Sequence, residues 1–259
     1  MIRNEQNLGF SAANNIGIRN SRGRNILILN DDAILEEGAL NLMFQRLESG
    51  PKIGCVGPKL LNPDGSLQAS YTNRRFPRFL SIVCFLLHLD RLFEKTPFTR
   101  DLFTLDKDLE KSAEADHLAG ACLLLRHGAL DAVGDFDEGF HYLSEDADLC
   151  YRLKKAGWGI FYLAEARVTH FGSASIKRLD RSTRDPMFFR SMIRYFKKHS
   201  TPMGYFALRV TLSLVFALRV PVAFLLAIFR TSWTRRQRVD FAKAPLSTLR
   251  MVLFERPTP

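Results

Sequence analysis

The chain has 259 residues, of which 46% are hydrophobic and 25% are charged. These values are typical of a globular protein and exclude a mostly disordered, fibrous or polytopic membrane chain. The charge is uneven, because residues 1–170 carry 20 Lys and Arg against 23 Asp and Glu, whereas residues 171–259 carry 17 against 4. This asymmetry predicts an anionic partner for the C-terminal third alone.

The four cysteines form no Cys-x-x-Cys pair and lie among apolar neighbours. We therefore expect buried, reduced thiols in a cytoplasmic protein, and no zinc site. The first ten residues contain no apolar segment of signal-peptide length, so secretion is not expected.

The first quarter of the chain alternates helical and strand patterns. Residues 11–19 predict a helix of small residues that ends by Gly23. Residues 25–30 form an apolar run that is typical of a strand buried on both faces, and residues 53–56 predict a second one. Residues 36–48 have helical spacing between them. The apolar side of that helix is expected to consist of Leu40, Met43, Phe44 and Leu47.

The middle of the chain continues the alternation. Residues 79–89 predict a helix that packs on the domain or on a membrane surface, because the apolar run is too short to span a bilayer. Residues 122–125 predict a third buried strand, and residues 127–133 a helix after it.

The clearest helix runs from Ser144 to Ala156, because Ser144 is a good N-cap residue and acidic residues fill the first turn. Strands are predicted over 158–163 and 167–170. Alternating strands and helices indicate an α/β domain with a Rossmann-like, mostly parallel sheet flanked by helices.

The last third has a different pattern. Residues 203–229 are strongly apolar but contain Arg209 and Arg219, and the longest charge-free run, 220–229, is shorter than the ~20 residues of a membrane span. With basic residues on both sides, this pattern predicts a helix or helical hairpin that lies in the membrane interface, its arginines reaching the headgroups. A true span that tolerates two arginines is the alternative. A nucleic-acid partner is not expected, because binding phosphates rarely needs so much Leu, Val and Phe.

Three polar residues, Asn30, Asp31 and Asp32, end the first buried strand. Ligands of open α/β sheets bind beyond the carboxyl ends of strands. Carboxylates buried there without partners would be costly, whereas Mg²⁺ or Mn²⁺ would satisfy them and hold a diphosphate. The alternative is a solvated turn in which Asp32 caps the next helix.

A second acidic group combines residues 135–138 with Glu145, Asp146 and Asp148. The first turn of a helix suits a general base, because the turn restricts the carboxylate and the helix dipole helps to keep it ionised. The alternative is that these residues only compensate the dipole.

Other signals are weaker. His170 follows a predicted strand and is a candidate metal ligand, although a lone histidine is more often structural. The turns at Asn7 and Gly9 and at Gly120 and Ala121 could reflect backbone geometry alone. The motifs of dehydrogenases, P-loop kinases, lipases and zincins are absent from the sequence.

The order of these signals along the chain is more specific than any one of them. The signals are Asn7-x-Gly9-Phe10-x-x-x-Asn14-Asn15, Leu29-Asn30-Asp31-Asp32, Gly120-Ala121, Phe136-Asp137-Glu138, Glu145-Asp146-x-Asp148-Leu149-x-x-Arg152 and His170. This order strongly resembles the family 2 glycosyltransferases, above all their rhamnosyltransferase-like branch, over about residues 2–176.

The resemblance implies a GT-A fold, a nucleotide-diphospho-sugar donor and an inverting reaction. It implies Asp146 as the catalytic base with local support from Glu145 and Asp148, and a Mg²⁺ or Mn²⁺ ion held by Asp32 and His170. The donor-side residues that it implies are Asn7, Gly9, Asn15, Asn30, Asp31 and Asp32. The acceptor-side residues that it implies are Gly120, Ala121, Asp137 and Glu138.

One departure from the family pattern concerns the start of the chain. Family members begin with a strand of the type Val-x-Val-x-Asn-Tyr, a helix, and a second strand that ends in an Asp-Asn-x-Ser-x-Asp-Gly segment, and these elements grip the nucleotide. This chain begins near the third strand. We therefore expect an N-terminally truncated GT-A sheet with an incomplete donor site.

Taken together, these observations predict a catalytic domain over residues 1–176 and a basic, apolar helical region for membrane association over residues 177–259. The expected activity is transfer of a sugar, with rhamnose as first candidate, to a saccharide or lipid-linked saccharide in cell-surface polysaccharide synthesis. The expected place is the inner face of the cell membrane, on an anionic surface. The alternatives are a non-catalytic remnant that binds membrane or acceptor, and another metal-dependent nucleotidyl enzyme.

Overall fold

The computed structural model describes residues 2–68, 72, 74–89, 108–140, 142–172 and 179–254. The chain divides into two compact units. Unit 1 comprises residues 1–138 and 145–172, and unit 2 comprises residues 139–144 and 173–259. The predicted domain boundary between residues 176 and 177 lies outside the described residues.

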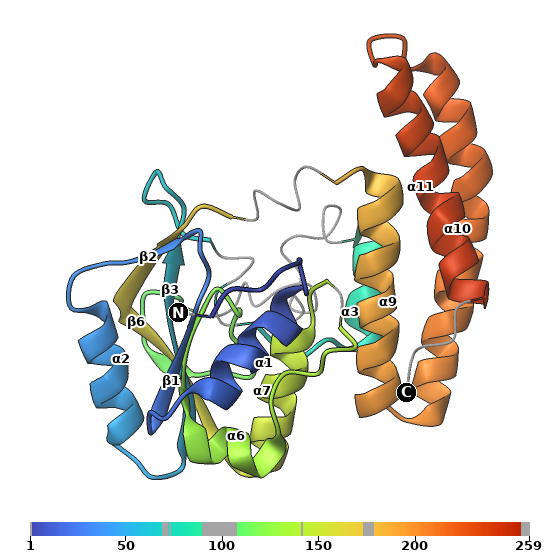
Figure 1. The fold of residues 1–259 in the computed structure, drawn as a ribbon. Coiled ribbons are helices and arrows are strands. Elements are labelled where there is room, and N and C mark those ends of the chain that lie inside the picture. Colours follow the sequence, from blue (N-terminus) through green and yellow to red (C-terminus); the bar gives the residue numbers. More distant parts are fainter. Residues whose placement is uncertain are drawn as a thin grey trace. The chain divides into compact units, whose positions relative to one another are not determined.

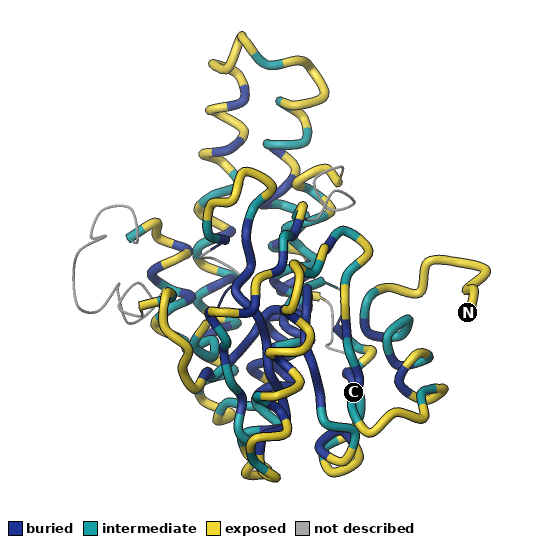
Figure 2. The backbone as a smooth tube through the Cα atoms, turned by 90° about the vertical axis from the view of Figure 1, so that its left-hand side faces the viewer, coloured by how far each residue is buried: buried dark blue, intermediate teal, exposed yellow. Residues whose placement is uncertain are grey.

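Unit 1 is built around one sheet (Figure 1). Its strands, in the order in which they pair, are β1 (Asn25–Leu29), β5 (Cys122–Arg126), β3 (Ile53–Leu61), β6 (Gly159–His170) and β2 (Ala33–Leu35), and β4 (Ala113–Glu114) pairs with β6. Every residue of β3 is buried, as expected for a central strand covered on both faces. Figure 2 shows these strands as the buried centre of the unit.

The α/β class is confirmed, but the expectation of mostly parallel pairing is wrong for the described strands. Only β3 and β6 run parallel, whereas β5 is antiparallel to both β1 and β3, and β6 is antiparallel to both β2 and β4. An apolar run reports that both faces of a strand are covered, and this burial is the same for either strand direction.

Helices cover both faces of the sheet. The helices in the described part of unit 1 are α1 (Phe10–Asn20), α2 (Ala39–Glu48), α3 (Phe79–Leu86), α6 (His127–Val133) and α7 (Glu145–Lys155). Met43 and Leu47 of α2 pack with Val56 of β3 in one core cluster. Ile18 of α1 and Leu149 of α7 belong to the cluster on the other face. Figure 1 accordingly places α2 on one side of the sheet and α1, α6 and α7 on the other.

Most predicted elements are present, with shifted ends. The helix predicted over 36–48 begins at Ala39, and the strand predicted over 53–56 extends to Leu61. The two strands predicted over 158–163 and 167–170 form the single strand β6.

Unit 2 contains three long helices, α9 (Arg181–His199), α10 (Pro202–Phe229) and α11 (Arg235–Phe254). The hydroxyl of Thr201 accepts a hydrogen bond from the Gly204 amide and caps α10, and Pro202 occupies its first turn. Helix α11 packs against both α9 and α10, and Figure 1 shows α10 and α11 as a hairpin.

The arginines of α10 face other protein groups. Arg209 donates hydrogen bonds to the hydroxyl of Tyr205 and to the carbonyl of Val252 on α11. The guanidinium of Arg219 lies over the ring of Phe216. Part of the Arg209 guanidinium is therefore used within unit 2, and the expectation that these two side chains reach lipid headgroups stays a prediction.

Candidate active site

The carboxylate of Asp146 lies in the first turn of α7 and is held from two directions. Its Oδ2 accepts a hydrogen bond of 3.0 Å from the Gly120 amide, and its Oδ1 accepts one of 2.8 Å from the Ala147 amide. The Nε2 atom of His117 lies 3.1 Å from the same Oδ1. The segment before β5 therefore fixes the orientation of the carboxylate predicted to be the base.

Gly120 can approach Asp146 because it has no side chain. A Cβ atom at this position would lie 2.9 Å from Cζ of Phe10 and 3.7 Å from Cβ of Asp146. Phe10, directly after Gly9, also packs edge-to-face on the ring of Phe136. The start of α1 thus lies against the turn that holds the carboxylate.

The pKa values of two neighbouring carboxyl groups on α7 are shifted in opposite directions. Burial works to raise the pKa of Asp146, but the adjacent His117 imidazole and the Gly120 amide lower this pKa to about 2. Burial, reinforced by the charge of Asp146, raises the pKa of Glu145 to about 8. Asp146 is therefore the ionised member of the pair at neutral pH.

The second predicted group brings Asp32 and His170 together. The Oδ1 atom of Asp32 lies 3.2 Å from Nε2 of His170, which is buried at the end of β6. The other ring nitrogen, Nδ1, lies 3.0 Å from Oε1 of Gln68, and Nε2 of Gln68 donates to the backbone carbonyl of His170. This orientation of the Gln68 amide makes Nδ1 the donor, so Nε2 is the ring nitrogen that faces Asp32.

That donor set fits a divalent cation. A carboxylate oxygen and an imidazole lone pair that face each other repel unless a proton or a metal ion lies between or beside them, and both are ligands of Mn²⁺. Within the described residues there is no cluster of three or more His, Cys, Asp or Glu side chains arranged for a metal. Asp32 and His170 would therefore supply two protein ligands.

The turns that carry the two predicted groups are adjacent. The amide of Asn30, at the end of β1, donates a hydrogen bond of 3.0 Å to the carbonyl of Ala121, and the next residue back, Gly120, contacts Asp146. Asp31 is exposed on the same turn and Asp32 follows it. A continuous path of contacts therefore joins the candidate metal ligand to the candidate base.

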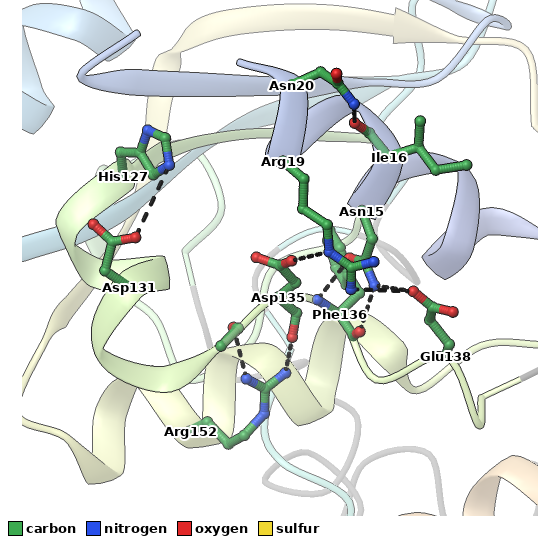
Figure 3. Close-up of polar contacts among 11 residues, drawn as sticks. Asn15, Ile16, Arg19, Asn20, His127, Asp131, Asp135, Phe136, Glu138 and Arg152 are labelled. Atoms are coloured by element: carbon green, nitrogen blue, oxygen red, sulfur yellow. Dashed lines mark hydrogen bonds and ion pairs between the residues drawn. The ribbon is translucent and has the colours of Figure 1, made fainter. Parts of the chain in front are cut away.

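Asn15 and Glu138 meet in a network at the edge of α1 (Figure 3). The fully buried amide of Asn15 donates to the Phe136 carbonyl and to Glu138 Oε1, each at 2.8 Å, and accepts from the Phe136 amide at 3.0 Å. Arg19 adds ion pairs to Asp135 and Glu138. Both amide hydrogens of Asn15 are used within the fold, so Asn15 positions the 135–138 segment, and its role on the side of the nucleotide-sugar donor stays a prediction.

Arg152 holds the same segment from α7. Its guanidinium forms an ion pair of 2.8 Å with the buried carboxylate of Asp148. It also donates to three consecutive backbone carbonyls, those of Val133, Gly134 and Asp135. Asp148 therefore anchors Arg152, and Asp137 lies in a segment that two helices hold in place.

The other predicted residue pair lies before α1. Asn7 is exposed, and its Oδ1 accepts a hydrogen bond of 2.9 Å from the amide of Gly9. Gly9 has a φ of 81°, a conformation that favours glycine, and it occupies the N-cap position of α1. Both residues thus shape the turn into α1.

The sequence interpretation missed His117 and Gln68. His117 stands three residues before the Gly120 turn, and this proximity is a signal that could have indicated it. Gln68 has no such signal, because it contacts a residue 102 positions away.

Comparison with known families gives a match over most of the chain. A family model described as "Glycosyltransferase like family 2" matches residues 1–197. Two of the relatives are an N-acetylglucosaminyl-diphospho-decaprenol L-rhamnosyltransferase of Mycobacterium tuberculosis, 30% identical over 59% of this chain, and the rhamnosyltransferase WbbL of Escherichia coli, 28% identical over 63%. The chain spans 48% of the length of the first relative and 61% of the second.

Solved structures add a weaker likeness. A Pyrobaculum calidifontis mannosyltransferase, PcManGT, in complex with GDP-Man and Mn²⁺ aligns with 96% of this chain and 68% of its own, at a TM-score of 0.48 and 13% identity. GalNAc-T7 with UDP, GalNAc and Mn²⁺ aligns with 75% of this chain and 38% of its own, at a TM-score of 0.47 and 14% identity. The family model, which covers well over half of the sequence, decides the assignment: the chain belongs to the glycosyltransferase-like family 2, as its motifs predicted.

Proposed function

We propose that the protein is an inverting glycosyltransferase that moves a sugar from a nucleotide-diphospho-sugar to a saccharide or lipid-linked saccharide. The observation that carries this proposal is the fixed, ionised carboxylate of Asp146 next to the turn that bears Asp32. Rhamnose is the first candidate sugar, because two relatives are named as rhamnosyltransferases. The product then enters cell-surface polysaccharide synthesis.

In an inverting transfer, the acceptor oxygen attacks the anomeric carbon from the face opposite the leaving diphosphate. Asp146 takes the hydroxyl proton as the new bond forms. The oxygen becomes strongly acidic as it bonds to carbon, so a carboxylate with a low pKa is a sufficient acceptor for the proton. The Gly120 amide keeps the carboxylate in place during this step.

Asp32 and His170 would hold a Mg²⁺ or Mn²⁺ ion. Such an ion, when bound, neutralises the charge that grows on the departing diphosphate. Gln68 fixes the tautomer of His170, and backbone contacts fix Asp32, whose carbonyl accepts from the Phe171 amide. Residues 1–176 form the catalytic domain in this proposal.

Calorimetry with UDP-, dTDP- and GDP-sugars in the presence of Mn²⁺ tests the assignment of function. The proposal predicts saturable binding of one nucleotide class and release of the nucleoside diphosphate when acceptor is added. Absence of binding to all three would favour a non-catalytic remnant. Release of pyrophosphate from a nucleoside triphosphate would favour a nucleotidyl enzyme.

The C-terminal region, residues 177–259, is proposed to rest on the anionic inner face of the cell membrane. Among the described residues, α10 alone is long and apolar enough to cross a membrane, and an 18-residue stretch of it has a mean hydropathy of 2.4. Eight of its exposed apolar side chains recur every three or four residues, which is the spacing of one helix face. These side chains are Met203, Phe206, Val210, Leu214, Leu218, Val222, Leu225 and Ile228.

The α10 stripe, as we call these eight residues, lies on a helix of 28 residues, or about 42 Å. The turn after α10 and the start of α11 carry Arg230, Arg235, Arg236 and Arg238. Carrying four guanidinium groups across a bilayer would be costly, whereas in the plane of the interface they contact anionic headgroups. We therefore favour a helix lying in the membrane plane over a span.

A further inference from the structure

His117 is a buried ring in contact with the candidate base. Its side chain is 3% exposed, and its Nε2 atom lies 3.1 Å from Asp146 Oδ1. Within the described part of the chain, neither ring nitrogen has a hydrogen-bond partner of good geometry, and the approach of Nε2 to Asp146 is an ion-pair contact. The contact that Nε2 makes with the carboxylate is therefore the main polar interaction of this ring.

The backbone holds His117 in this place. The His117 carbonyl accepts a hydrogen bond of 2.8 Å from the Arg74 amide, and the His117 amide donates one of 3.1 Å to the Arg74 carbonyl. Gly120, three residues later, donates to Asp146 Oδ2. One short, doubly anchored segment thus contacts both oxygens of the carboxylate, His117 on Oδ1 and Gly120 on Oδ2.

The two oxygens differ in what remains available to a substrate. A carboxylate oxygen has two lone-pair positions. On Oδ1 these face the Ala147 amide and His117, whereas on Oδ2 only one faces the Gly120 amide. Among the described residues, the lone-pair position that faces no donor is therefore on Oδ2.

We propose that His117 is a positioning residue of the transfer reaction, which turns Asp146 so that Oδ2 receives the acceptor proton and keeps that carboxylate ionised between turnovers. This inference rests on the proposed function for its catalytic meaning. In the transfer, the bond from the acceptor oxygen to the anomeric carbon forms and the bond to the diphosphate breaks. The electron pair of the broken bond leaves with the diphosphate, and the hydroxyl proton goes to Oδ2.

Four ionisable side chains interact electrostatically with Asp146. His117 and Arg74 favour its ionised form. The carboxyl of Glu145 stands next to it in the chain, and the thiol of Cys150 lies one turn later on α7. Glu145 and Cys150 are both neutral at pH 7, because burial raises their pKa to about 8 and about 12. We therefore expect the pKa of Asp146 to change more on removal of His117 than on removal of any of the other three side chains.

The test compares His117→Leu and His117→Gln with the control His127→Gln. His127 lies on α6, and its Nε2 is 4.0 Å from Asp131, so the control removes a histidine near a carboxylate away from the site. The carboxyl ¹³C signal of Asp146 is titrated in aspartate-labelled protein and assigned with Asp146→Asn. We expect the Leu variant to raise the pKa of Asp146 by about one unit or more. The Gln variant should raise this pKa less, because its amide can donate a hydrogen bond to the carboxylate. The control should leave the pKa unchanged.

Turnover gives the second measurement. We expect the acid limb of the kcat profile to move to higher pH in His117→Leu, with kcat lowered about tenfold or more and the donor KM within about twofold. An unshifted Asp146 titration in both His117 variants would overturn the inference. If the titration shifts but the wild-type protein transfers no sugar, the proposed function fails while the coupling of His117 to Asp146 stands.

Discussion

At the scale of single residues, Glu145 and Asp146 differ more than their adjacency suggests. Both begin α7, yet the pKa of Glu145 is about 8 and that of Asp146 about 2. The Glu145 Oε2 atom is buried with no hydrogen-bond partner in the described part of the chain, whereas Asp146 has two amide donors and His117. Environments that separate two carboxyl groups in this way are a mark of acid–base sites.

Glu145 should make the protein less stable as the pH rises. Its folded-state pKa lies above the unfolded value of ~4.3, so the folded state binds a proton that the unfolded state releases, and the free energy of unfolding falls between about pH 4.3 and 8. We expect Glu145→Gln to remove this loss. The change in Tm from pH 5 to pH 8 should then be more favourable in the variant than in the wild type by about 2 °C or more. Thermal unfolding at both pH values measures it, with the exposed Glu36→Gln as control. Parallel pH dependence in wild type and Glu145→Gln would contradict the assignment.

Asn15 allows a separate test of a structural role. Asn15→Ala removes three hydrogen bonds and leaves the buried Phe136 amide and carbonyl without them, so we expect a loss of about 2–4 kcal/mol in the free energy of unfolding. Asn20→Ala on the same helix is the control, because its exposed side chain contacts only the carbonyl of Ile16 within the described contacts. Urea denaturation measures both. If Asn15→Ala were as stable as the wild type but bound the nucleotide-sugar more weakly, Asn15 would instead be a residue of the donor site.

Residue chemistry could be predicted from the sequence where a motif carries it. Asp32 and His170 were expected to share a site, and the structure places them 3.2 Å apart. The partners Gln68 and His117 were missed, because each reaches its carboxylate or imidazole neighbour through the tertiary fold. Periodicity reports how a segment is buried and carries no information about which distant segment it meets.

At the scale of elements, periodicity likewise does not report the direction of a strand or how much of a helix face is buried. The strand over 122–125 was predicted from its apolar run, but the run could not say that β5 lies antiparallel to both neighbours. In α2, Met43 and Leu47 are fully buried as predicted, whereas Leu40 and Phe44 are 42% and 43% exposed. Helical spacing identifies a face that is apolar, and the packing of the sheet decides how much of that face is covered.

The turn between residue 117 and β5 can be tested by a substitution at Gly120. Gly120→Ala would place a methyl group 2.9 Å from the Phe10 ring and displace the amide that holds Asp146. We expect a loss of about 1–3 kcal/mol in stability and a fall of about tenfold or more in transfer. The control is Gly128→Ala in α6, where a Cβ atom meets nothing within 4 Å and alanine should stabilise the helix by about 0.5–1 kcal/mol. Normal transfer by Gly120→Ala would mean that this turn does not position the base.

At the scale of the whole molecule, the contrast between units is one of charge and surface. The last 89 residues hold 17 Lys and Arg against 4 Asp and Glu, as the sequence alone established. The apolar content of residues 203–229 was also evident, but the sequence could not reveal that Arg209 turns toward α11. Helix packing therefore leaves the α10 stripe free of arginine, although the segment contains two.

The stripe should mediate membrane binding. We expect Leu214→Ser combined with Leu218→Ser to lower binding to vesicles that contain anionic phospholipid about tenfold or more, because two of its most exposed leucines are lost. Vesicle flotation measures it, with Leu40→Ser on α2 as the control for loss of an exposed leucine. High salt should weaken the wild-type interaction by screening the basic residues without abolishing it. Unchanged flotation of the double variant would exclude the stripe as the docking surface.

Sugar transfer, as proposed, depends on Asp146 as the catalytic base. The most direct measurement is the rate of transfer from the nucleotide-sugar that binds, compared between wild type and Asp146→Asn, with donor affinity measured on the same samples. We predict that Asp146→Asn loses transfer by about 10²-fold or more while the donor Kd stays within about twofold. Full transfer by Asp146→Asn, with the donor still bound, would contradict the account.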